Sequence, residues 1–251
     1  MDVETRELQQ LLMAADQLPE VLLLKPSTAS TNDDVRDIAQ KGIRHVLVSS
    51  RVQTQGRGQR QRQWISPEGN IYLSTLLSTD IAIDGRLALE IALNILQIPS
   101  LQQLNIQVKW PNDLYSPQGK WGGILVEPLN QQQAIIGVGI NLSPIQDPSI
   151  DQAVTSLHEL GLEDGQRIQL ISEIYLAIQQ AGQWFSYNSQ NLAARFNYHA
   201  AFMQQSVEFT DQHGQYLGTF IGIQADGAVQ IETAAGIKVF YQGQLRLKHP
   251  C

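Results

Sequence analysis

The sequence predicts an α+β protein in which a large domain of helices and strands precedes a small domain of strands alone. Its 251 residues are 43% hydrophobic and 16% charged, which is typical of a globular chain with a sizeable core. Up to about Gln204, segments with helical and with strand periodicity alternate along the chain. Beyond that residue, short apolar segments separated by glycine-containing turns follow one another without a helical period.

Apolar residues at helical spacing predict five helices. Two of them have clear ends in the sequence. The first stops at Pro19, and the second follows Ser30, which we expect to cap it, and closes at Gly42. The predicted helices are Thr5–Leu18, Asp33–Gln40, Arg86–Leu96, Leu170–Tyr187 and Leu192–Phe196.

Short apolar runs between turn residues predict strands. In the large domain these are Val21–Leu24, His45–Ser49, Ile71–Leu77, Val108–Trp110, Gly123–Glu127 and Ala134–Ile140. Five more strands follow at short spacing and predict a small barrel of the SH3-like kind. They are Ser206–Thr210, Tyr216–Ile223, Val229–Glu232, Ile237–Tyr241 and Leu245–Leu247. We therefore expect one domain over residues 1–203 and a second over residues 204–251.

The composition argues against several classes of partner. Lys and Arg number 17 against 24 acidic residues, and the net charge of -7 is unfavourable for a general nucleic-acid binder. The N-terminal residues lack the basic start and apolar run of a signal peptide, and no apolar stretch approaches the roughly 18 residues of a membrane-spanning helix. The single cysteine, Cys251, is the last residue, so we expect no internal disulfide. We expect a soluble cytoplasmic protein that binds neither nucleic acid nor membrane.

Several familiar sites are absent from the sequence. It contains no GxxxxGK[ST] phosphate loop and no GxSxG nucleophile motif. Gly137–Leu142 (GVGINL) begins like a dinucleotide-binding fingerprint but lacks the third glycine and the following helix. The five histidines show neither HxH nor HxxxH spacing, so we expect no metal held by protein side chains.

The first positive signal is the polar segment Arg51–Asn70, which is too long for an ordinary turn. Within it, Gly56–Arg62 (GRGQRQR) alternates cations with glycine or glutamine just before Trp64. Glycines let backbone amides approach an anion, and arginine supplies charge-assisted donors. The pattern favours an anion-binding loop, while a solvated surface loop and an RNA-binding loop stay open as alternatives.

Two further segments combine lysines with special backbone positions. Lys109–Asp113 (KWPND) ends a strand with a lysine, whose burial is costly unless its charge is paired or used, and continues into a tight turn. Lys120–Glu127 (KWGGILVE) places two glycines in a strand, which lets a flat ligand or another chain lie against the backbone. Taken separately, the first also fits an ordinary edge strand and the second a β-bulge.

Five motifs follow one another at plausible distances: Ser30–Asn32 (STN), Gly56–Gly58 (GRG), Lys109–Asp113, Gly122–Glu127 (GGILVE) and Gly137–Leu142. Together they resemble the biotin protein ligase family over most of the chain. The resemblance implies a class II synthetase-like catalytic domain, which is a mixed β-sheet with helices, followed by an SH3-like C-terminal domain. It also implies the short form of the family without an N-terminal DNA-binding domain.

The same resemblance implies an ATP-dependent biotin–[acetyl-CoA-carboxylase] ligase. In such ligases ATP activates biotin to biotinyl-5′-AMP with release of pyrophosphate. The biotinyl group then passes to one lysine of the biotin carboxyl carrier protein of acetyl-CoA carboxylase. Mg²⁺ is implied with the triphosphate, held partly by phosphate and water rather than by a protein cage. Since many members of the family dimerise, a homodimer is a further expectation.

The family motifs imply roles for individual residues of this chain. Those implied to bind biotin are Ser30, Thr31, Asn32, Gln53, Arg57, Gly58, Gln59 and Lys109. Those implied to bind ATP or the adenylate are Arg60, Arg62, Trp64, Lys120 and Asn141. Lys109 and Arg57 are the implied catalytic residues, because cations offset the repulsion between the biotin carboxylate and the α-phosphate that it attacks.

Two positions depart from the family loop, which usually reads GRGRxGR. Gln59 replaces its second arginine and Gln61 its second glycine. A neutral amide keeps a donor but lacks the charge, so we expect the adenylate to be held less firmly. Two other functions stay open: a lipoate or octanoate ligase or transferase of the related fold, and a repressor that senses the adenylate. The repressor requires a DNA-binding domain, which we do not expect in the roughly twenty N-terminal residues.

Overall fold

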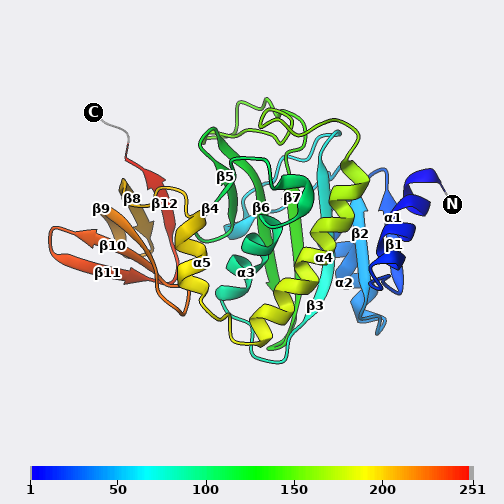
Figure 1. The fold of residues 1–251 in the computed structure, drawn as a ribbon, viewed down its shortest axis with the longest axis horizontal. Coiled ribbons are helices and arrows are strands. Elements are labelled where there is room, and N and C mark those ends of the chain that lie inside the picture. The colour runs from blue at the N-terminus through cyan, green and yellow to red at the C-terminus, as the bar shows by residue number, and fades with distance from the viewer. Residues whose placement is uncertain (1, 249–251) are drawn as a thin grey trace.

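The computed structural model describes residues 2–248, and its larger part is built on one seven-stranded sheet (Figure 1). The strands lie in the order β1-β2-β3-β7-β6-β5-β4. β1 and β2 are parallel and the other neighbours are antiparallel, so the predicted α+β class with a mixed sheet is confirmed. The strands are β1 (Val21–Lys25), β2 (Val46–Ser50), β3 (Ile71–Ser78), β4 (Gln107–Lys109), β5 (Asp113–Ser116), β6 (Gly119–Pro128) and β7 (Gln133–Ile140).

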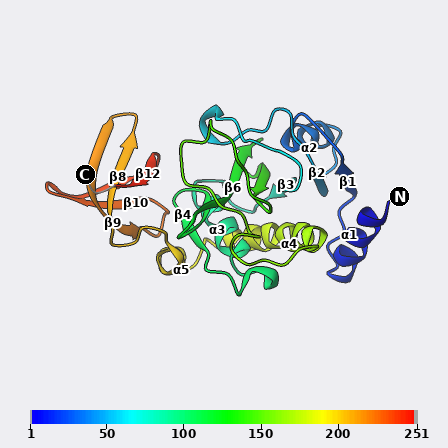
Figure 2. The same cartoon turned by 90° about the horizontal axis from the view of Figure 1, so that it is seen from above.

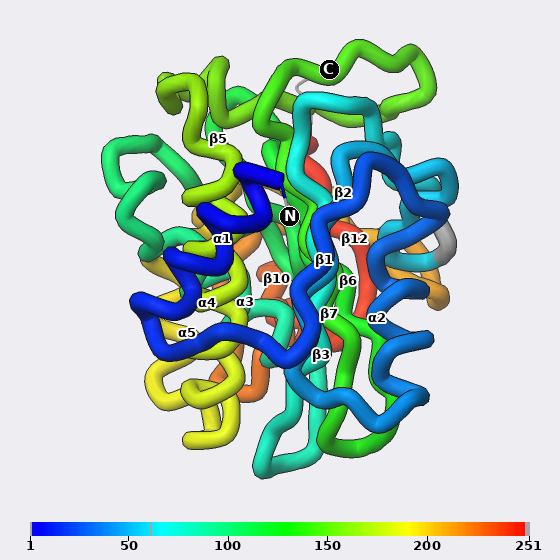
Figure 3. Tube along the Cα trace, turned by 90° about the vertical axis from the view of Figure 1, so that its right-hand side faces the viewer, coloured from blue at the N-terminus to red at the C-terminus, as the bar shows by residue number. Residues whose placement is uncertain are grey.

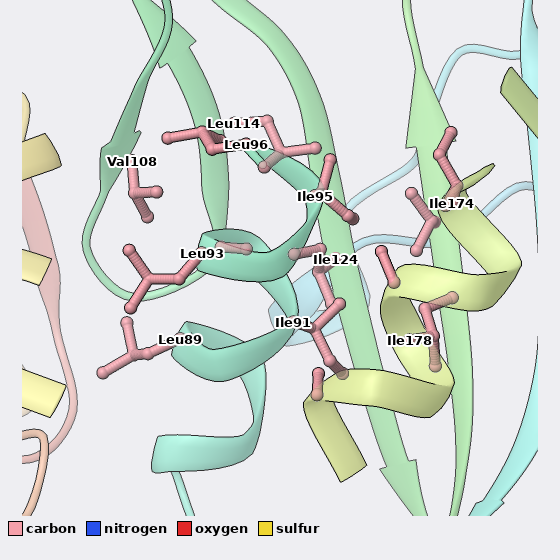
Figure 4. Packing of buried hydrophobic residues seen from close by; sticks show 14 of the residues in the cluster. Leu89, Ile91, Leu93, Ile95, Leu96, Val108, Leu114, Ile124, Ile174 and Ile178 are labelled. Carbon is pink, nitrogen blue, oxygen red and sulfur yellow. The ribbon is translucent and has the colours of Figure 1, made fainter. Parts of the chain in front are cut away.

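Helices cover both faces of this sheet, as Figures 2 and 3 show. On one face lie α1 (Val3–Ala14), α3 (Arg86–Ile95) and α4 (Arg167–Ser186), and on the other lies α2 (Thr31–Gln40). Figure 4 shows side chains of α3 and α4 next to Ile124 of β6. These side chains (Ile91, Ile95, Ile174 and Ile178) are fully buried. Their packing fixes the central strands, which carry the glycine-rich motifs.

The start of α2 differs from the sequence expectation. Ser30 occupies the N-cap position with an extended backbone, but its hydroxyl makes no capping hydrogen bond. Asp33 and Asp34 in the first turn place negative charge where the helix dipole favours it. Val35 and Ala39 anchor the helix in a separate apolar cluster against the sheet. Packing and charge therefore hold this helix end without the Ser30 side chain.

The small domain follows α5 (Leu192–His199) and consists of one antiparallel five-stranded sheet. Its order is β11-β10-β9-β8-β12, and it lies at the end of the molecule opposite the N-terminus (Figure 1). The strands are β8 (Ser206–Asp211), β9 (Gly214–Ile223), β10 (Val229–Thr233), β11 (Gly236–Phe240) and β12 (Gln244–Leu247). All five strands predicted for this part of the chain are present.

Trp110 joins the two domains. Its side chain is buried, and its indole Nε1 donates a hydrogen bond to the carbonyl of Gly227, at 3.0 Å, before β10. Its ring also packs at 5.9 Å between centroids against Phe209 of β8. Because Trp110 directly follows Lys109, the small domain holds the strand end that carries this lysine.

Several predicted boundaries were wrong. α1 starts earlier because Asp2 caps it, accepting a hydrogen bond from the backbone N of Thr5 at 2.9 Å, and it ends before Asp16, which has a left-handed backbone (φ 53°). α4 covers residues 167–186 rather than 170–187. β5 was missed because its four residues are too short to give a periodic signal, and β6 begins at Gly119 rather than Gly123.

Two short 3₁₀ turns, η1 (Gln59–Gln61) and η2 (Pro99–Leu101), complete the elements. Within residues 2–248, no helix combines the length and apolarity needed to cross a bilayer. Cys251 lies outside the described residues.

We predict that Trp110→Phe destabilises the protein by about 1–3 kcal/mol, because phenylalanine keeps the ring packing but leaves the Gly227 carbonyl without its buried donor. Urea unfolding measures this loss. Trp184→Phe is the matched control, since Trp184 is 39% exposed, and we expect it to cost about 0.5 kcal/mol or less. Equal losses in the two variants would contradict the role of Trp110 as the joint between the domains.

Candidate active site

One cavity is lined by both domains. Its walls come from the start of α2, the loop 53–64, the turn between β4 and β5, strands β6 and β7, and β12 of the small domain. All but one of the predicted site residues line it: Ser30, Thr31, Asn32, Gln53, Arg57, Gly58, Gln59, Arg60, Arg62, Trp64, Lys109 and Lys120. Asn141 lines an adjoining cavity together with Arg62, Trp64 and Lys120. The structure therefore brings the predicted residues together around two neighbouring cavities.

Neutral polar side chains line one end of the first cavity. Gln53 Oε1 accepts hydrogen bonds from the backbone N and the hydroxyl of Thr31, at 3.0 and 3.1 Å. Gln53 Nε2 donates to Ser66 Oγ at 3.1 Å, and Thr31 Oγ1 lies 2.7 Å from Ser74 Oγ. These bonds fix the orientation of donors and acceptors that suit a neutral polar ligand.

Asn32 belongs to the same buried set. Its Oδ1 accepts from Ser74 Oγ at 2.5 Å, and its Nδ2 donates to Glu127 Oε2 at 3.0 Å. A Cβ atom at Gly137 of β7 would overlap Asn32 Oδ1, so the close approach of this side chain requires glycine there. Ser74 was not predicted as a site residue, because its place in a buried strand gives no local signal.

Arg57 is paired with carboxylates at the edge of the cavity. Its Nη1 and Nη2 each donate to one oxygen of Asp33 at 2.7 Å, and Nη2 also lies 3.6 Å from Glu127 Oε1. The hydrogen bonds from Arg57 lower the pKa of Asp33. The guanidinium therefore lines the cavity with much of its charge already neutralised by α2 and β6.

Lys109 and Lys120 meet on one carboxylate. Lys109 Nζ lies 3.1 Å from Asp113 Oδ2, and Lys120 Nζ lies 2.5 Å from Asp113 Oδ1. All three side chains are only 12–13% exposed. Burial opposes the ionisation of Asp113, but the attraction of Lys120 and Lys109 outweighs it and lowers the pKa of this carboxyl. Two cations on one anion leave excess positive charge in a partly desolvated place, which suits an anionic ligand.

Asp113, like Ser74, lies at the site but was not predicted there from the sequence. It was assigned only to the turn after Lys109. Its position four residues after one lysine and seven before another was the available signal, but only the pairing of β4, β5 and β6 brings the three side chains together.

Trp64 accounts for two glycines of the central strands. A Cβ atom at Gly139 would come within 2.6 Å of the indole, and one at Gly123 within 3.2 Å. The ring also lies under Lys120, whose Nζ is 5.1 Å from the ring centroid. The sequence left open whether the pair Gly122–Gly123 makes room for a flat ligand or another chain, or marks a β-bulge. In the structure Trp64 lies over Gly123, whereas Gly122 packs against Ile140 and Leu114, and the register between β5 and β6 shifts beside it.

The adjoining cavity has a mixed lining, in which apolar residues lie beside the charged Arg62, Lys120 and Asp151. Ile145, Ile150 and Val154 line it. Among the described residues, Trp64 Nε1 and Asn141 Oδ1 are buried and make no hydrogen bond. Buried polar groups are normally paired, so these two shielded atoms are exceptions among the residues that line this cavity.

The loop between these cavities is closed by its own backbone. The amide of Gly58 donates to the Arg62 carbonyl at 2.8 Å, and that of Trp64 donates to Gly56 at 2.9 Å. Gln59 and Arg60 form part of the 3₁₀ turn η1, and both side chains are exposed at the cavity rim. The segment is therefore part of the cavity wall rather than a detached surface loop.

Comparison with known proteins agrees with this arrangement. The biotin/lipoate A/B protein ligase family matches residues 24–141, and the biotin protein ligase C terminal domain matches residues 204–244. The bifunctional ligase/repressor BirA of Bacillus spizizenii is 28% identical over 239 residues, covering 90% of this chain and 74% of that protein. The biotin–[acetyl-CoA-carboxylase] ligase of Mycobacterium tuberculosis is 29% identical over 205 residues, covering 77% of this chain and 76% of that protein.

The chain spans 64–74% of the length of the bifunctional ligase/repressors that it matches. Its fold resembles the biotin protein ligase from Aquifex aeolicus in complex with biotin and ATP, with a TM-score of 0.78 and 24% identity. That match covers 92% of this chain and the whole of the Aquifex chain. Catalytic-domain and C-terminal-domain matches in the same order, on the same fold, show that the chain belongs to the biotin protein ligase family.

Proposed function

We propose that this chain activates biotin with ATP to biotinyl-5′-AMP and transfers the biotinyl group to a lysine of a biotin carboxyl carrier protein. One observation carries the proposal. A single cavity presents a neutral hydrogen-bonding set around Thr31, Asn32 and Gln53, together with the cationic Lys109–Asp113–Lys120 group. This combination matches a ligand with a neutral polar ring and a carboxylate that must meet a phosphate.

The neutral end fits the ureido ring of biotin. A urea group presents two N–H donors and one carbonyl acceptor, and it carries no charge to be compensated. Ser30, Thr31, Asn32 and Gln53 supply hydroxyl and amide partners. Thr31 and Gln53 bond each other, and Ser74 and Glu127 hold Asn32, before the ligand arrives. Gly58 and Gln59, at the loop, complete the proposed biotin site.

The cationic group fits the reacting centre. A carboxylate oxygen of biotin attacks the α-phosphorus of ATP, the bond to the β-phosphate oxygen breaks, and pyrophosphate leaves. Lys109 offsets the repulsion between these anions and stabilises charge on the phosphate oxygens, with Lys120 beside it. Arg57 contributes to this charge stabilisation only if its guanidinium leaves Asp33 and binds the anionic ligand instead.

In the second step the uncharged amine of the carrier lysine attacks the acyl carbon of the adenylate. AMP leaves, an amide bond forms, and the amine loses a proton. We assign the nucleotide to the adjoining cavity, because Trp64 and Asn141 line it beside the cationic side chains of Arg62 and Lys120. Arg62 and Lys120 line both cavities, and Arg60 lines the first, so we place the phosphate beside these three cations.

The residues present do not build a magnesium site of their own. Among residues 2–248 no group of three or more His, Cys, Asp or Glu side chains is placed to hold a metal ion. The acids that line the first cavity or contact its cations are paired with Arg or Lys: Asp33, Asp113, Glu127 and Asp151. We therefore infer that Mg²⁺ enters with ATP, coordinated by phosphate oxygens and water, and neutralises part of the triphosphate charge.

The partners follow from this reaction. We infer that the carrier protein is that of acetyl-CoA carboxylase, as the name of the Mycobacterium relative says of that enzyme. We also infer a cytoplasmic location, because the reaction consumes ATP. A homodimer stays a prediction, which sedimentation of the purified chain tests directly.

The proposal predicts that biotin, but neither lipoate nor octanoate, supports exchange of labelled pyrophosphate into ATP. The reason is the neutral polar set, because a plain acyl chain excludes water from it and offers no hydrogen bond in return, at a cost of about 1–3 kcal/mol per buried group. Exchange with lipoate or octanoate and none with biotin would favour the related lipoate or octanoate enzymes instead.

A second prediction concerns Gln59. An arginine there adds a charged hydrogen bond to the adenylate, worth about 1.5–3 kcal/mol, so Gln59→Arg is expected to release biotinyl-5′-AMP roughly 10- to 100-fold more slowly. Rapid filtration of labelled adenylate measures the rate. Gln55→Arg is the matched control, because it adds the same charge at an exposed position of the same loop. Equal rates for wild type and Gln59→Arg would mean that the side chain at position 59 points to solvent, and would contradict this interpretation of the loop.

A further inference from the structure

The small domain supplies part of the cavity wall as well as holding Trp110. Gly243–Arg246, at β12, form part of the cavity wall. Nη2 of Arg246 donates a hydrogen bond to Asp151 Oδ2 at 2.9 Å. Asp151 lies between β7 and α4, on a segment that lines the adjoining cavity. This ion pair therefore crosses from the small domain to the wall of the proposed nucleotide site.

The segment that carries Asp151 is anchored at both of its ends. At one end the amide of Ser143 donates to Asn70 Oδ1 at 2.9 Å. At the other, Lys120 N donates to the Ala153 carbonyl and Thr155 N to the Lys120 carbonyl, each at 3.0 Å, which extends the pairing of β6. The stretch 144–152 lies between these anchors.

Within this stretch Ile145, Ile150 and Gln152 line the adjoining cavity, and Gln152 lines the first one as well. Among the described residues, the stretch 144–152 makes hydrogen bonds within itself and one to a residue elsewhere in the chain, Arg246. The position of the nucleotide-side wall therefore depends on a contact with the other domain.

Charge favours this contact from two sides. The hydrogen bond from Arg246 lowers the pKa of Asp151, and the field of Arg62 acts in the same direction. Arg62 belongs to the loop 56–64, so three separate parts of the chain are drawn together at the rim: this loop, the stretch 144–152 and β12.

We propose that Arg246 and Asp151 form a latch between the two domains that closes the nucleotide end of the cavity and retains biotinyl-5′-AMP. The latch rests on the proposed ligase function. Both residues are positioning residues: they act by holding the stretch 144–152 against the bound adenylate.

The Arg246–Asp151 ion pair is weak enough to break and re-form during the reaction. Its side chains are 49% and 68% exposed, and exposed ion pairs are weak and screened by salt. A strong closure would hinder release of AMP after transfer. The expected effect of breaking the latch is therefore modest, about two- to five-fold in the rate of adenylate dissociation.

The test compares dissociation of labelled biotinyl-5′-AMP from wild type, Asp151→Asn, Arg246→Gln, the double variant and the charge exchange Asp151→Arg with Arg246→Asp. We expect faster release in both single variants, no further increase in the double variant, and recovery in the charge exchange. At about 1 M salt, where the Debye length falls to about 3 Å, wild type and single variants should release at similar rates. Asp84→Asn is the control, because it removes one carboxylate charge from an ion pair with Arg86 outside the cavity, and Asp84 itself is 46% exposed.

The effect of Asp151→Asn on the release rate distinguishes a latch, which predicts faster release, from direct phosphate binding by Arg246, which predicts slower release. If Arg246 bound the phosphate, Asp151→Asn would free it and slow release, while Arg246→Gln would speed it; that result overturns the latch. If the wild type forms the adenylate and every variant releases it at the wild-type rate, the latch is also overturned, while the ligase function stands. A wild type that forms no adenylate overturns the proposed function itself.

Discussion

Asp113 holds two lysines at one point of the cavity, and the arrangement of the site depends on this buried carboxylate. Strand pairing sets it opposite Lys109 on β4 and opposite Gly123 on β6, and a register shift after Leu114 brings Lys120 to its other oxygen. Because water reaches these side chains so little, their attraction is poorly screened. Removing the carboxylate would leave two ammonium groups close together, and breaking a buried pair costs about 3–5 kcal/mol.

Both domains keep this group in place. Trp110, next to Lys109, is held by the Gly227 carbonyl and Phe209 of the small domain. Trp64 packs under Lys120 and against the glycine strands of the large one. The small domain also reaches the cavity through β12, so it shapes the site as well as supporting it. Elements of two separate sheets therefore position the Lys109–Asp113–Lys120 group.

The sequence predicted the α+β class and most strands and helices, because each has a local period or a turn signal. It also pointed to the residues around the cavity through ordered motifs. It missed β5, which has only four residues, and the roles of Asp113 and Ser74. Those roles arise where strands pair or where α2 meets β3, and no local pattern records such contacts. Likewise, only the packed structure shows that Trp64, rather than a ligand, requires Gly139.

The central claim is that Lys109, held by Asp113, stabilises the charge that develops when biotin attacks ATP. Biotin-dependent exchange of pyrophosphate into ATP by Lys109→Ala tests it most directly, with thermal unfolding to establish that the variant is folded. Lys238→Ala, at an exposed lysine of β11, is the matched control. The account predicts a loss of at least about 100-fold for Lys109→Ala, the scale of one preorganised charge, and little change for the control. Near-normal exchange by a folded Lys109→Ala protein would contradict it.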